Sequence, residues 1–155
     1  MDPSPSKQLL LIADADPKNV SVLKTMLAPD FDIKVAADAE ETIRLASSAD
    51  TPALILLNDM MPTADVSEVC RRLKGGQTTG DIPIILLSEP TTEDTEARGF
   101  ELGAADYITK PFKRSVVNAR IRIHLELKRY RDNFEKRLKK RVNGLHEEIQ
   151  ERRDI

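Results

Sequence analysis

Five short runs rich in apolar residues alternate with amphipathic segments through the first two thirds of the chain. The runs cover residues 8–13, 31–36, 53–57, 82–87 and 105–108. A short, nearly continuous apolar run is typical of a strand that is buried on both faces of a sheet. The pattern therefore predicts five buried strands.

The segments between these runs carry helix signals. Asp16-Pro17 opens the first helix, because Pro is favoured at the start of a helix, and Asp38 is at the capping position of the second. Two further helices are predicted, one over 66–73 that is ended by Gly75-Gly76 and one over 92–102 that is stopped by Gly103. Strands that alternate with helices pair in parallel through right-handed crossovers. The predicted fold class is therefore α/β, with a doubly wound, five-stranded parallel sheet.

The carboxyl ends of parallel strands meet at one edge of such a sheet, and functional residues of doubly wound folds gather there. The residues that directly follow the predicted strands should therefore lie together. They are Asp14, Ala15, Asp16, Asn58, Asp59, Ser88 and Lys110.

The last part of the chain predicts one long helix. Residues 114–153 contain no helix breaker except Gly144, which allows a helix of up to ~40 residues and about 60 Å. Its apolar residues lie three or four positions apart and form a stripe. The stripe consists of Leu127, Tyr130, Phe134, Leu138, Val142, Leu145 and Ile149. Its spacing fits an eleven-residue repeat better than a heptad.

A narrow apolar stripe on a charged helix needs a partner surface. We expect it to pair with the stripe of a second copy, which gives a homodimer joined by a parallel two-helix coiled coil. The alternatives are that the stripe folds back onto its own domain, or that the helix frays. The predicted organisation is a disordered N-terminus over 1–6, a globular domain over 7–125 and a coiled-coil stalk over 126–155.

Charge is distributed unevenly along the chain. Residues 1–112 hold 10 Lys and Arg against 19 Asp and Glu, a net charge of −9, whereas residues 113–155 hold 14 against 7, a net charge of +7. A basic helix can bind nucleic acid or an anionic membrane surface. Here the basic residues go around the helix and are interleaved with Asp and Glu, as on a solvated surface. We therefore expect neither a nucleic-acid nor a membrane partner.

Residue counts exclude several kinds of site. The single cysteine, Cys70, cannot form an intramolecular disulfide or a cysteine zinc cluster, and its helical neighbours indicate core packing. His124 and His146 are too far apart to indicate a metal pair, and His124 is expected on the helix surface. No apolar run approaches the ~20 residues of a membrane span. Because residues 1–6 also lack the features of a signal peptide, we expect a soluble, cytoplasmic protein.

Several ordered segments resemble one known family. The segments LLLIADADPKN, ALILLNDMMPTADVSEVCRRLK, IPIILLSE and GFELGAADYITKPF together resemble the CheY-like receiver domain of two-component response regulators. The resemblance covers roughly residues 7–125. The segment RIRIHLELKRYRD is similar to the helix that leads from a receiver into a cyclic-di-GMP output domain. The resemblance implies a flavodoxin-like receiver fold with a long C-terminal helix, in a bacterial two-component or cyclic-di-GMP pathway.

The family works by phosphoryl transfer from a histidine kinase to an Asp after the third strand. Acidic residues after the first strand help to hold Mg²⁺, and a Lys after the fifth strand binds the phosphoryl oxygens. A Ser or Thr after the fourth strand and an aromatic residue on the fifth respond to the phosphate. The resemblance assigns these last three roles to Lys110, Ser88 and Tyr107. It assigns the Mg²⁺ site to Asp14, Asn58 and Met60.

Three positions depart from the family pattern, one of them Val66, which replaces the Gly that usually follows the Asp at position 65. The acceptor Asp lies four residues before the Pro of a Met-Pro pair, and counting back from Met61-Pro62 gives Asn58. The acidic pair falls on Asp14 and Ala15, so one carboxylate is missing. A neutral amide is a very poor nucleophile, and Mg²⁺ is held through carboxylates. The resemblance thus implies a pseudo-receiver whose phosphorylation chemistry is lost and whose Mg²⁺ site is weak or lost.

A substitute acceptor is available in Asp59. Neighbours on an extended segment point in opposite directions, so Asp59 should face away from Lys110. Asp16 is expected to cap the first helix rather than to replace the carboxylate missing at Ala15. An engineered change of Asp to Asn would explain Asn58 but not Ala15, so natural degeneracy is favoured.

These observations favour a non-enzymatic regulatory module without a cofactor, unless the degenerate site still binds Mg²⁺. It would act by dimerisation and protein–protein signalling through its C-terminal helix, with a histidine kinase or another signalling protein as partner. Because the helix ends abruptly at Ile155, an output domain is expected outside this chain. Two alternatives stay open, a response regulator phosphorylated on a nearby Asp and a basic-helix binder of nucleic acid or membrane.

Overall fold

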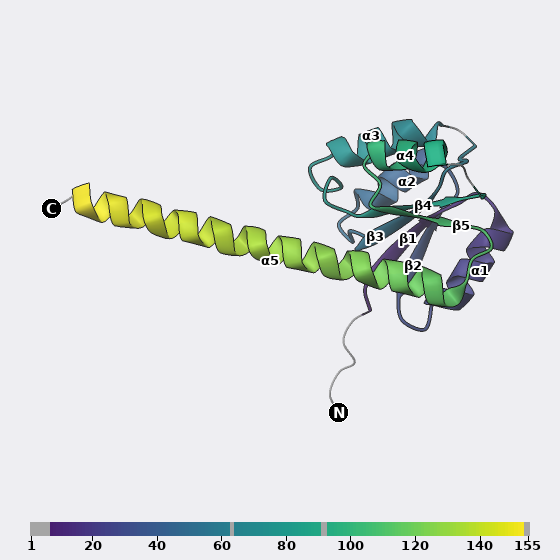
Figure 1. Cartoon of the computed structure of the whole chain (residues 1–155), viewed down its shortest axis with the longest axis horizontal. Helices are drawn as coiled ribbons and strands as arrows, with labels where there is room; N and C mark the ends of the chain where they lie inside the picture. The colour runs from purple at the N-terminus through teal and green to yellow at the C-terminus, as the bar shows by residue number, and fades with distance from the viewer. Residues whose placement is uncertain (1–6, 63, 91–92, 154–155) are drawn as a thin grey trace, which may run out of the picture.

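The computed structural model describes residues 7–62, 64–90 and 93–153, in which an α/β domain carries one long projecting helix (Figure 1). The predicted disorder of residues 1–6 and the predicted helix start at Thr92 lie outside the described residues. Strands and helices alternate along the chain as the apolar pattern predicted.

Five parallel strands form the sheet. They are β1 (Leu9–Ala13), β2 (Asp32–Ala36), β3 (Leu54–Asn58), β4 (Ile84–Ser88) and β5 (Asp106–Thr109), in the order β2-β1-β3-β4-β5. This order confirms the predicted doubly wound α/β fold. The fourth strand begins at Ile84 rather than at Ile82, because Pro83 has no backbone N–H to offer to a neighbouring strand.

The helices cover both faces of the sheet. They are α1 (Pro17–Leu27), α2 (Ala39–Ala46), α3 (Val66–Gly75), α4 (Glu93–Glu101) and α5 (Arg114–Arg153). Helices α2, α3 and α4 lie on one face, and α1 and the first part of α5 lie on the other (Figure 1). Asp16, Asp38 and Asp65 each accept a backbone N–H from the first turn of the helix that follows, so the predicted caps at Asp16 and Asp38 are confirmed.

The sheet is buried on both faces, which explains why the strands read as continuous apolar runs. Leu11, Ile55 and Leu57 pack towards α2 and α3, while Leu10 and Ile12 pack towards α1 and α5. Cys70 of α3 is 1% exposed in the first of these clusters, and burial raises the pKa of its thiol to about 11. The predicted core role of Cys70 is confirmed.

Helix α5 belongs partly to the domain and partly to a stalk. Val117 and Ile121 in its first turns are fully buried, and the helix then runs away from the domain (Figure 1). The seven stripe residues from Leu127 to Ile149 are 43% to 66% exposed, so the stripe does not fold back onto its own domain. No helix within the described ranges is both long and apolar enough to cross a membrane.

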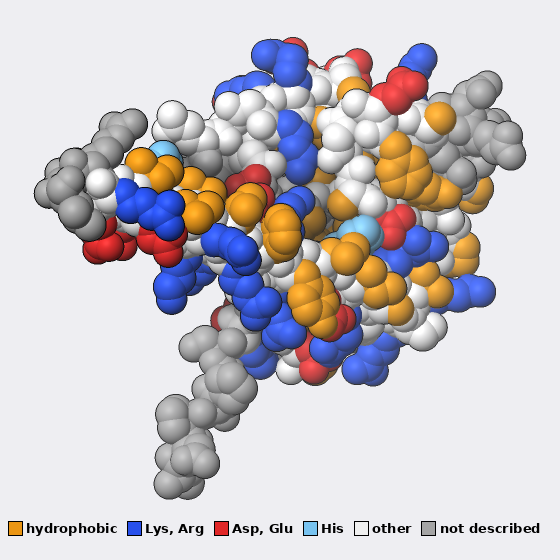
Figure 2. Space-filling model, turned by 60° about the vertical axis from the view of Figure 1, so that its left-hand side comes forward, with side chains coloured by type: hydrophobic (Ala, Val, Ile, Leu, Met, Phe, Trp, Pro, Cys, Tyr) orange, Lys and Arg blue, Asp and Glu red, His pale blue; other side chains and the backbone are white. Residues whose placement is uncertain are grey.

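The stripe continues onto the domain itself. Val116 and Ile123 are also exposed, and they lie eleven residues before Leu127 and Phe134. Figure 2 shows the resulting line of hydrophobic side chains along the helix, flanked by Lys and Arg. The eleven-residue repeat therefore extends over almost the whole of α5.

Asp106, the first residue of β5, holds α5 against the edge of the sheet. Both oxygens of its carboxylate lie 3.0 Å from Nη1 of Arg120, and Oδ2 also lies 3.0 Å from Nε2 of His124. The backbone N–H of Tyr107 also donates to it at 2.8 Å. Burial raises the pKa of Asp106, but these hydrogen bonds outweigh it, so the pKa lies below its ordinary value. His124 is therefore half-buried against β5, and its predicted place on the helix surface was wrong.

Replacing Asp106 by Asn should lower the free energy of unfolding by about 1–2 kcal/mol at pH 5, because charge-assisted hydrogen bonds to Arg120 and His124 are lost. The depressed pKa of Asp106 means that its contribution is fully present above the unfolded-state pKa of about 3.9 and is lost as the pH falls through the folded-state value. Urea unfolding at pH 5 and pH 3 measures both effects. A difference between the variant and the wild type that stays constant between these pH values would contradict this assignment.

Candidate functional site

The carboxyl ends of the central strands surround a cavity of about 380 Å³. It is lined by Asp14, Ala15, Asp16, Asn19, Asn58, Asp59, Met60, Ser88, Glu89 and Lys110. All the residues that were expected to meet at this edge of the sheet do so. The three residues assigned to the Mg²⁺ site, Asp14, Asn58 and Met60, are among them.

Asp14 lies at the centre of a hydrogen-bond network. Its side chain is nearly inaccessible, with 2% exposure, directly after β1. Its Oδ1 accepts the backbone N–H of Asp16 at 2.9 Å, and its Oδ2 accepts Nδ2 of Asn19 at 3.1 Å and Nδ2 of Asn58 at 3.0 Å. Three N–H donors thus compensate the buried carboxylate.

Asn58 is fixed at both ends of its amide. It is the last residue of β3 and is 9% exposed. While Nδ2 donates to Asp14, Oδ1 accepts the backbone N–H of Met60 at 2.8 Å. The side chain of Met60 itself is 78% exposed. A carboxylate in place of Asn58 could accept the hydrogen bond from Met60 but could not donate to Asp14.

The side chains of the two residues that follow Asp14, Ala15 and Asp16, form no hydrogen bond with its carboxylate. Ala15 is exposed and offers no side-chain oxygen. Asp16 uses Oδ1 to accept the backbone N–H of Lys18 at 2.9 Å, as the cap of α1.

Asp59 lies in the wall of the same cavity as Asn58 and Lys110, so alternation along the strand does not remove it from the site as expected. Burial is the main cause that raises the pKa of its carboxyl above the ordinary value. The charge of Glu89 raises the pKa further. The backbone N–H of Asp59 and the charge of Lys110 lower it by less.

Lys110 forms an ion pair within the site. Its Nζ lies 2.8 Å from Oε1 of Glu89, and this hydrogen bond is the main cause that raises the pKa of Lys110. Ser88 is buried at the end of β4, and Tyr107 packs edge-on against Phe100 with ring centroids 5.7 Å apart. The three residues assigned to phosphate binding and switching thus lie on β4, on β5 and at the end of β5.

Sequence reasoning missed two residues of the site, Asn19 and Glu89. Glu89 directly follows Ser88, so its place after a strand was a usable signal. Asn19 lies on the first turn of α1, and only the fold shows that its amide points back to Asp14. Within the part of the chain that the structure describes, no group of three or more His, Cys, Asp or Glu side chains is arranged to hold a metal ion.

Residues 10–122 match the response regulator receiver domain. The chain belongs to this family. "Response regulator PleD" of Caulobacter vibrioides is 34% identical over 114 residues, which cover 73% of this chain and 25% of PleD. A Vibrio cholerae serotype O1 protein named "Probable cyclic di-GMP phosphodiesterase" is 32% identical over 127 residues, which cover 82% of this chain and 29% of that protein. This receiver chain therefore spans less than a third of the length of either relative.

Solved receiver domains share the fold. The signal receiver domain of a signal transduction histidine kinase from Syntrophus aciditrophicus is 31% identical, with a TM-score of 0.69 and coverage of 77% of this chain and 90% of that one. The receiver domain of sensor histidine kinase PA1611 from Pseudomonas aeruginosa PAO1 was solved with a magnesium ion coordinated in its active site cleft. It is 22% identical, with a TM-score of 0.70 and coverage of 78% and 99%.

Changing Asn58 to Asp in this receiver should destabilise the fold in metal-free buffer by about 1–3 kcal/mol at pH 7, because two buried carboxylates then face each other. The penalty should shrink as the pH falls towards about 4, because a protonated carboxyl can donate to Asp14 as the amide does. Urea unfolding with a chelator measures both effects. The exposed Asn143→Asp change on the stalk is the matched control, and an equal effect of the two changes would contradict the role given to the Asn58 amide.

Proposed function

We propose that this receiver domain is a pseudo-receiver, a regulatory module that signals without being phosphorylated. The observation that carries the proposal is the 3.0 Å hydrogen bond from Nδ2 of Asn58 to Oδ2 of Asp14. Counting from Met61-Pro62 gives Asn58 the position of the phosphoacceptor. Its amide is used by Asp14 and by the backbone of Met60, and it offers no nucleophilic oxygen to phosphorus.

The charge of the cavity also opposes a phosphodonor. Asp14, Asp16, Asp59 and Glu89 line it together with a single cation, Lys110, which is already paired with Glu89. An incoming phosphate is an anion and would be repelled by the unbalanced carboxylates. The same repulsion argues against Asp59 as a substitute acceptor, although Asp59 lines the cavity.

The residues at this site do not fit the Mg²⁺ that the family implies. Mg²⁺ requires several oxygen ligands in nearly octahedral geometry. Both oxygens of Asp14 already accept N–H donors, Oδ1 of Asn58 accepts the backbone N–H of Met60, and Ala15 has no side-chain oxygen. The three N–H donors compensate the negative charge of Asp14, which a bound cation would otherwise do. We therefore propose that signalling by this domain needs no metal.

The proposed output is a dimer formed through α5. Side chains of the stripe are about half exposed in a single copy, and burial of apolar surface contributes about 25 cal/mol per Å². Pairing with a second copy in parallel would cover the stripe from Val116 to Ile149 and place both domains at the same end. A parallel arrangement also delivers both stalks together to a partner such as a histidine kinase or another signalling protein, or to an output domain of a longer chain.

Incubation with acetyl phosphate and Mg²⁺ should leave the intact mass of the wild-type protein unchanged, because neither a nucleophile nor a metal site is in place. The double change Ala15→Asp with Asn58→Asp restores both carboxylates and should allow a gain of one phosphoryl group, more than either single change does. Mass spectrometry measures the gain. A phosphorylated wild type that loses the modification on Asp59→Ala would overturn the pseudo-receiver and make Asp59 the acceptor.

Replacing Leu138 by Lys should weaken dimerisation by about 100-fold or more, because two unpaired charges would then be buried in the seam. The domain should remain folded, since Leu138 is exposed on the stalk. Light scattering across a concentration series measures the change. Asn133→Lys adds the same charge away from the stripe and is the matched control, and a chain cut after Leu127 should be monomeric. If all these proteins scatter as the same species, α5 is not the dimer interface.

A further inference from the structure

The side of α5 opposite the stripe carries basic residues. With 3.6 residues per turn, residues two positions apart lie on nearly opposite sides of a helix. Arg129 is thus placed opposite Leu127, and Lys136 and Lys140 are placed opposite Leu138. A dimer that uses the stripe would therefore leave this side of each helix accessible.

This opposite side is strongly basic. Counted around the whole helix, residues 128–141 hold eight Lys and Arg against two acidic residues, Asp132 and Glu135. Three of these exposed cations lie on the side opposite the stripe, and we call them the basic face; they are Lys136, Lys139 and Lys140. Among the described residues, Lys128 forms an ion pair with Asp132 at 2.7 Å, whereas none of the three residues of the basic face forms one.

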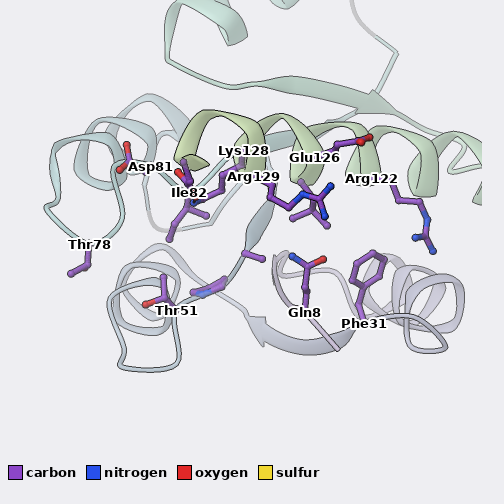
Figure 3. A pocket seen from close by; sticks show the side chains of 14 residues that line it. Gln8, Phe31, Thr51, Thr78, Asp81, Ile82, Arg122, Glu126, Lys128 and Arg129 are labelled. Carbon is purple, nitrogen blue, oxygen red and sulfur yellow. The ribbon is translucent and has the colours of Figure 1, made fainter. Parts of the chain in front are cut away.

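A groove of about 910 Å³ lies beside the domain end of the basic face, between α5 and the amino-terminal edge of the sheet (Figure 3). Its lining includes the partly exposed apolar side chains of Ala53 and Leu125, beside the buried Phe31 and Ile82. In Figure 3, Arg122 and Arg129 reach from the helix towards the domain, above Phe31 and Gln8. The groove therefore has apolar side chains on its domain side and the cations Arg122 and Arg129 on its helix side.

Polar contacts fix the two walls of the groove. Arg122 pairs with Asp30 at 3.3 Å and lies 5.7 Å from the centroid of the Phe31 ring. Further along the helix, Nη2 of Arg131 donates to the backbone oxygen of Asp81 at 3.1 Å. Because α5 is held to the domain at both ends of the groove, the groove is already formed before anything binds in it.

We propose that the groove and the basic face together bind an acidic, partly apolar polypeptide segment of a partner protein. Carboxylates of the segment would lie along the basic face, and an apolar side chain would enter the groove. A protein segment fits better than nucleic acid or an anionic membrane. Asp81, Glu126 and Asp132 also line the groove, so the part of the ligand that enters it must be uncharged. A polypeptide can alternate carboxylates with apolar side chains, whereas a nucleic acid or an anionic membrane presents a continuous row of phosphates.

This surface goes beyond the proposed function, since it involves neither the cavity around Asp14 nor the stripe. The probe that tests it is a fluorescent 16-residue peptide, Glu-Leu-Glu-Pro repeated four times. Its prolines prevent it from forming a helix that could pair with the stripe. Fluorescence anisotropy with the full chain should show saturable binding that weakens at least about tenfold between 50 and 300 mM salt, as charge attraction requires.

Two sets of variants separate the basic face from net charge. The triple change Lys136→Glu, Lys139→Glu and Lys140→Glu should weaken binding at least about tenfold, because it reverses the basic face. The triple change Lys18→Glu, Lys24→Glu and Arg44→Glu alters the net charge equally on exposed positions of the domain and should leave affinity within about twofold. Circular dichroism should show the same helix content in both proteins.

Matched probes test the two remaining parts of the proposal. A peptide with Ser in place of Leu should bind at least about fivefold more weakly, since the groove then loses its apolar occupant. The proposal is overturned if the acidic peptide does not bind, if both triple variants lose affinity alike, or if the Ser peptide binds as well as the Leu peptide. It is also overturned if a 20-base-pair DNA duplex or phosphatidylserine vesicles bind more tightly than the peptide in the same salt.

Discussion

The hydrogen bond between the amide of Asn58 and the carboxylate of Asp14 determines how the site of this receiver domain can work. A buried carboxylate is stable only when something compensates its charge. In this chain three N–H donors compensate Asp14, namely Asn58, Asn19 and the backbone of Asp16. On the proposed account a cation is not needed beside Asp14, so we expect the fold not to depend on metal. The donor at the end of β3 is an amide, so the acceptor position that we propose has no nucleophilic oxygen.

Strand β5 joins this site to the stalk. Lys110, just beyond its carboxyl end, lies in the cavity and pairs with Glu89, while Asp106 at its amino end holds Arg120 and His124 of α5. Asp106 and Lys110 are only four positions apart along the chain. The direction in which α5 leaves the domain is therefore tied to the same strand that positions Lys110. A domain with a fixed, metal-free site would hold its stalk in one fixed direction, which suits a module that presents α5 to a second copy and to a partner.

The sequence contained enough to predict the fold, because both faces of the sheet are buried and the strands consequently appear as apolar runs. The site at the carboxyl ends followed from the alternation of strands and helices, whereas the roles given to Asn58 and Ala15 rest on the resemblance to the family and stay predictions. Contacts between side chains of distant elements could not be predicted. The pairing of His124 with Asp106 requires knowing which side of α5 meets β5, and the donation from Asn19 requires knowing how α1 sits over Asp14. Asp59 was expected to face away from Lys110, yet it lines the same cavity.

The most direct measurement is the NMR signal of the Asn58 side-chain amide during a titration with MgCl₂ through the millimolar range. The signal is assigned by its loss in the Asn58→Asp variant, and the exposed amide of Asn143 serves as the internal reference. We expect the Asn58 amide to exchange slowly with solvent and to shift no more than that of Asn143, because it stays bonded to Asp14. A saturable shift of the Asn58 amide alone, with faster exchange, would show that Mg²⁺ displaces it from Asp14 and would contradict a metal-free pseudo-receiver.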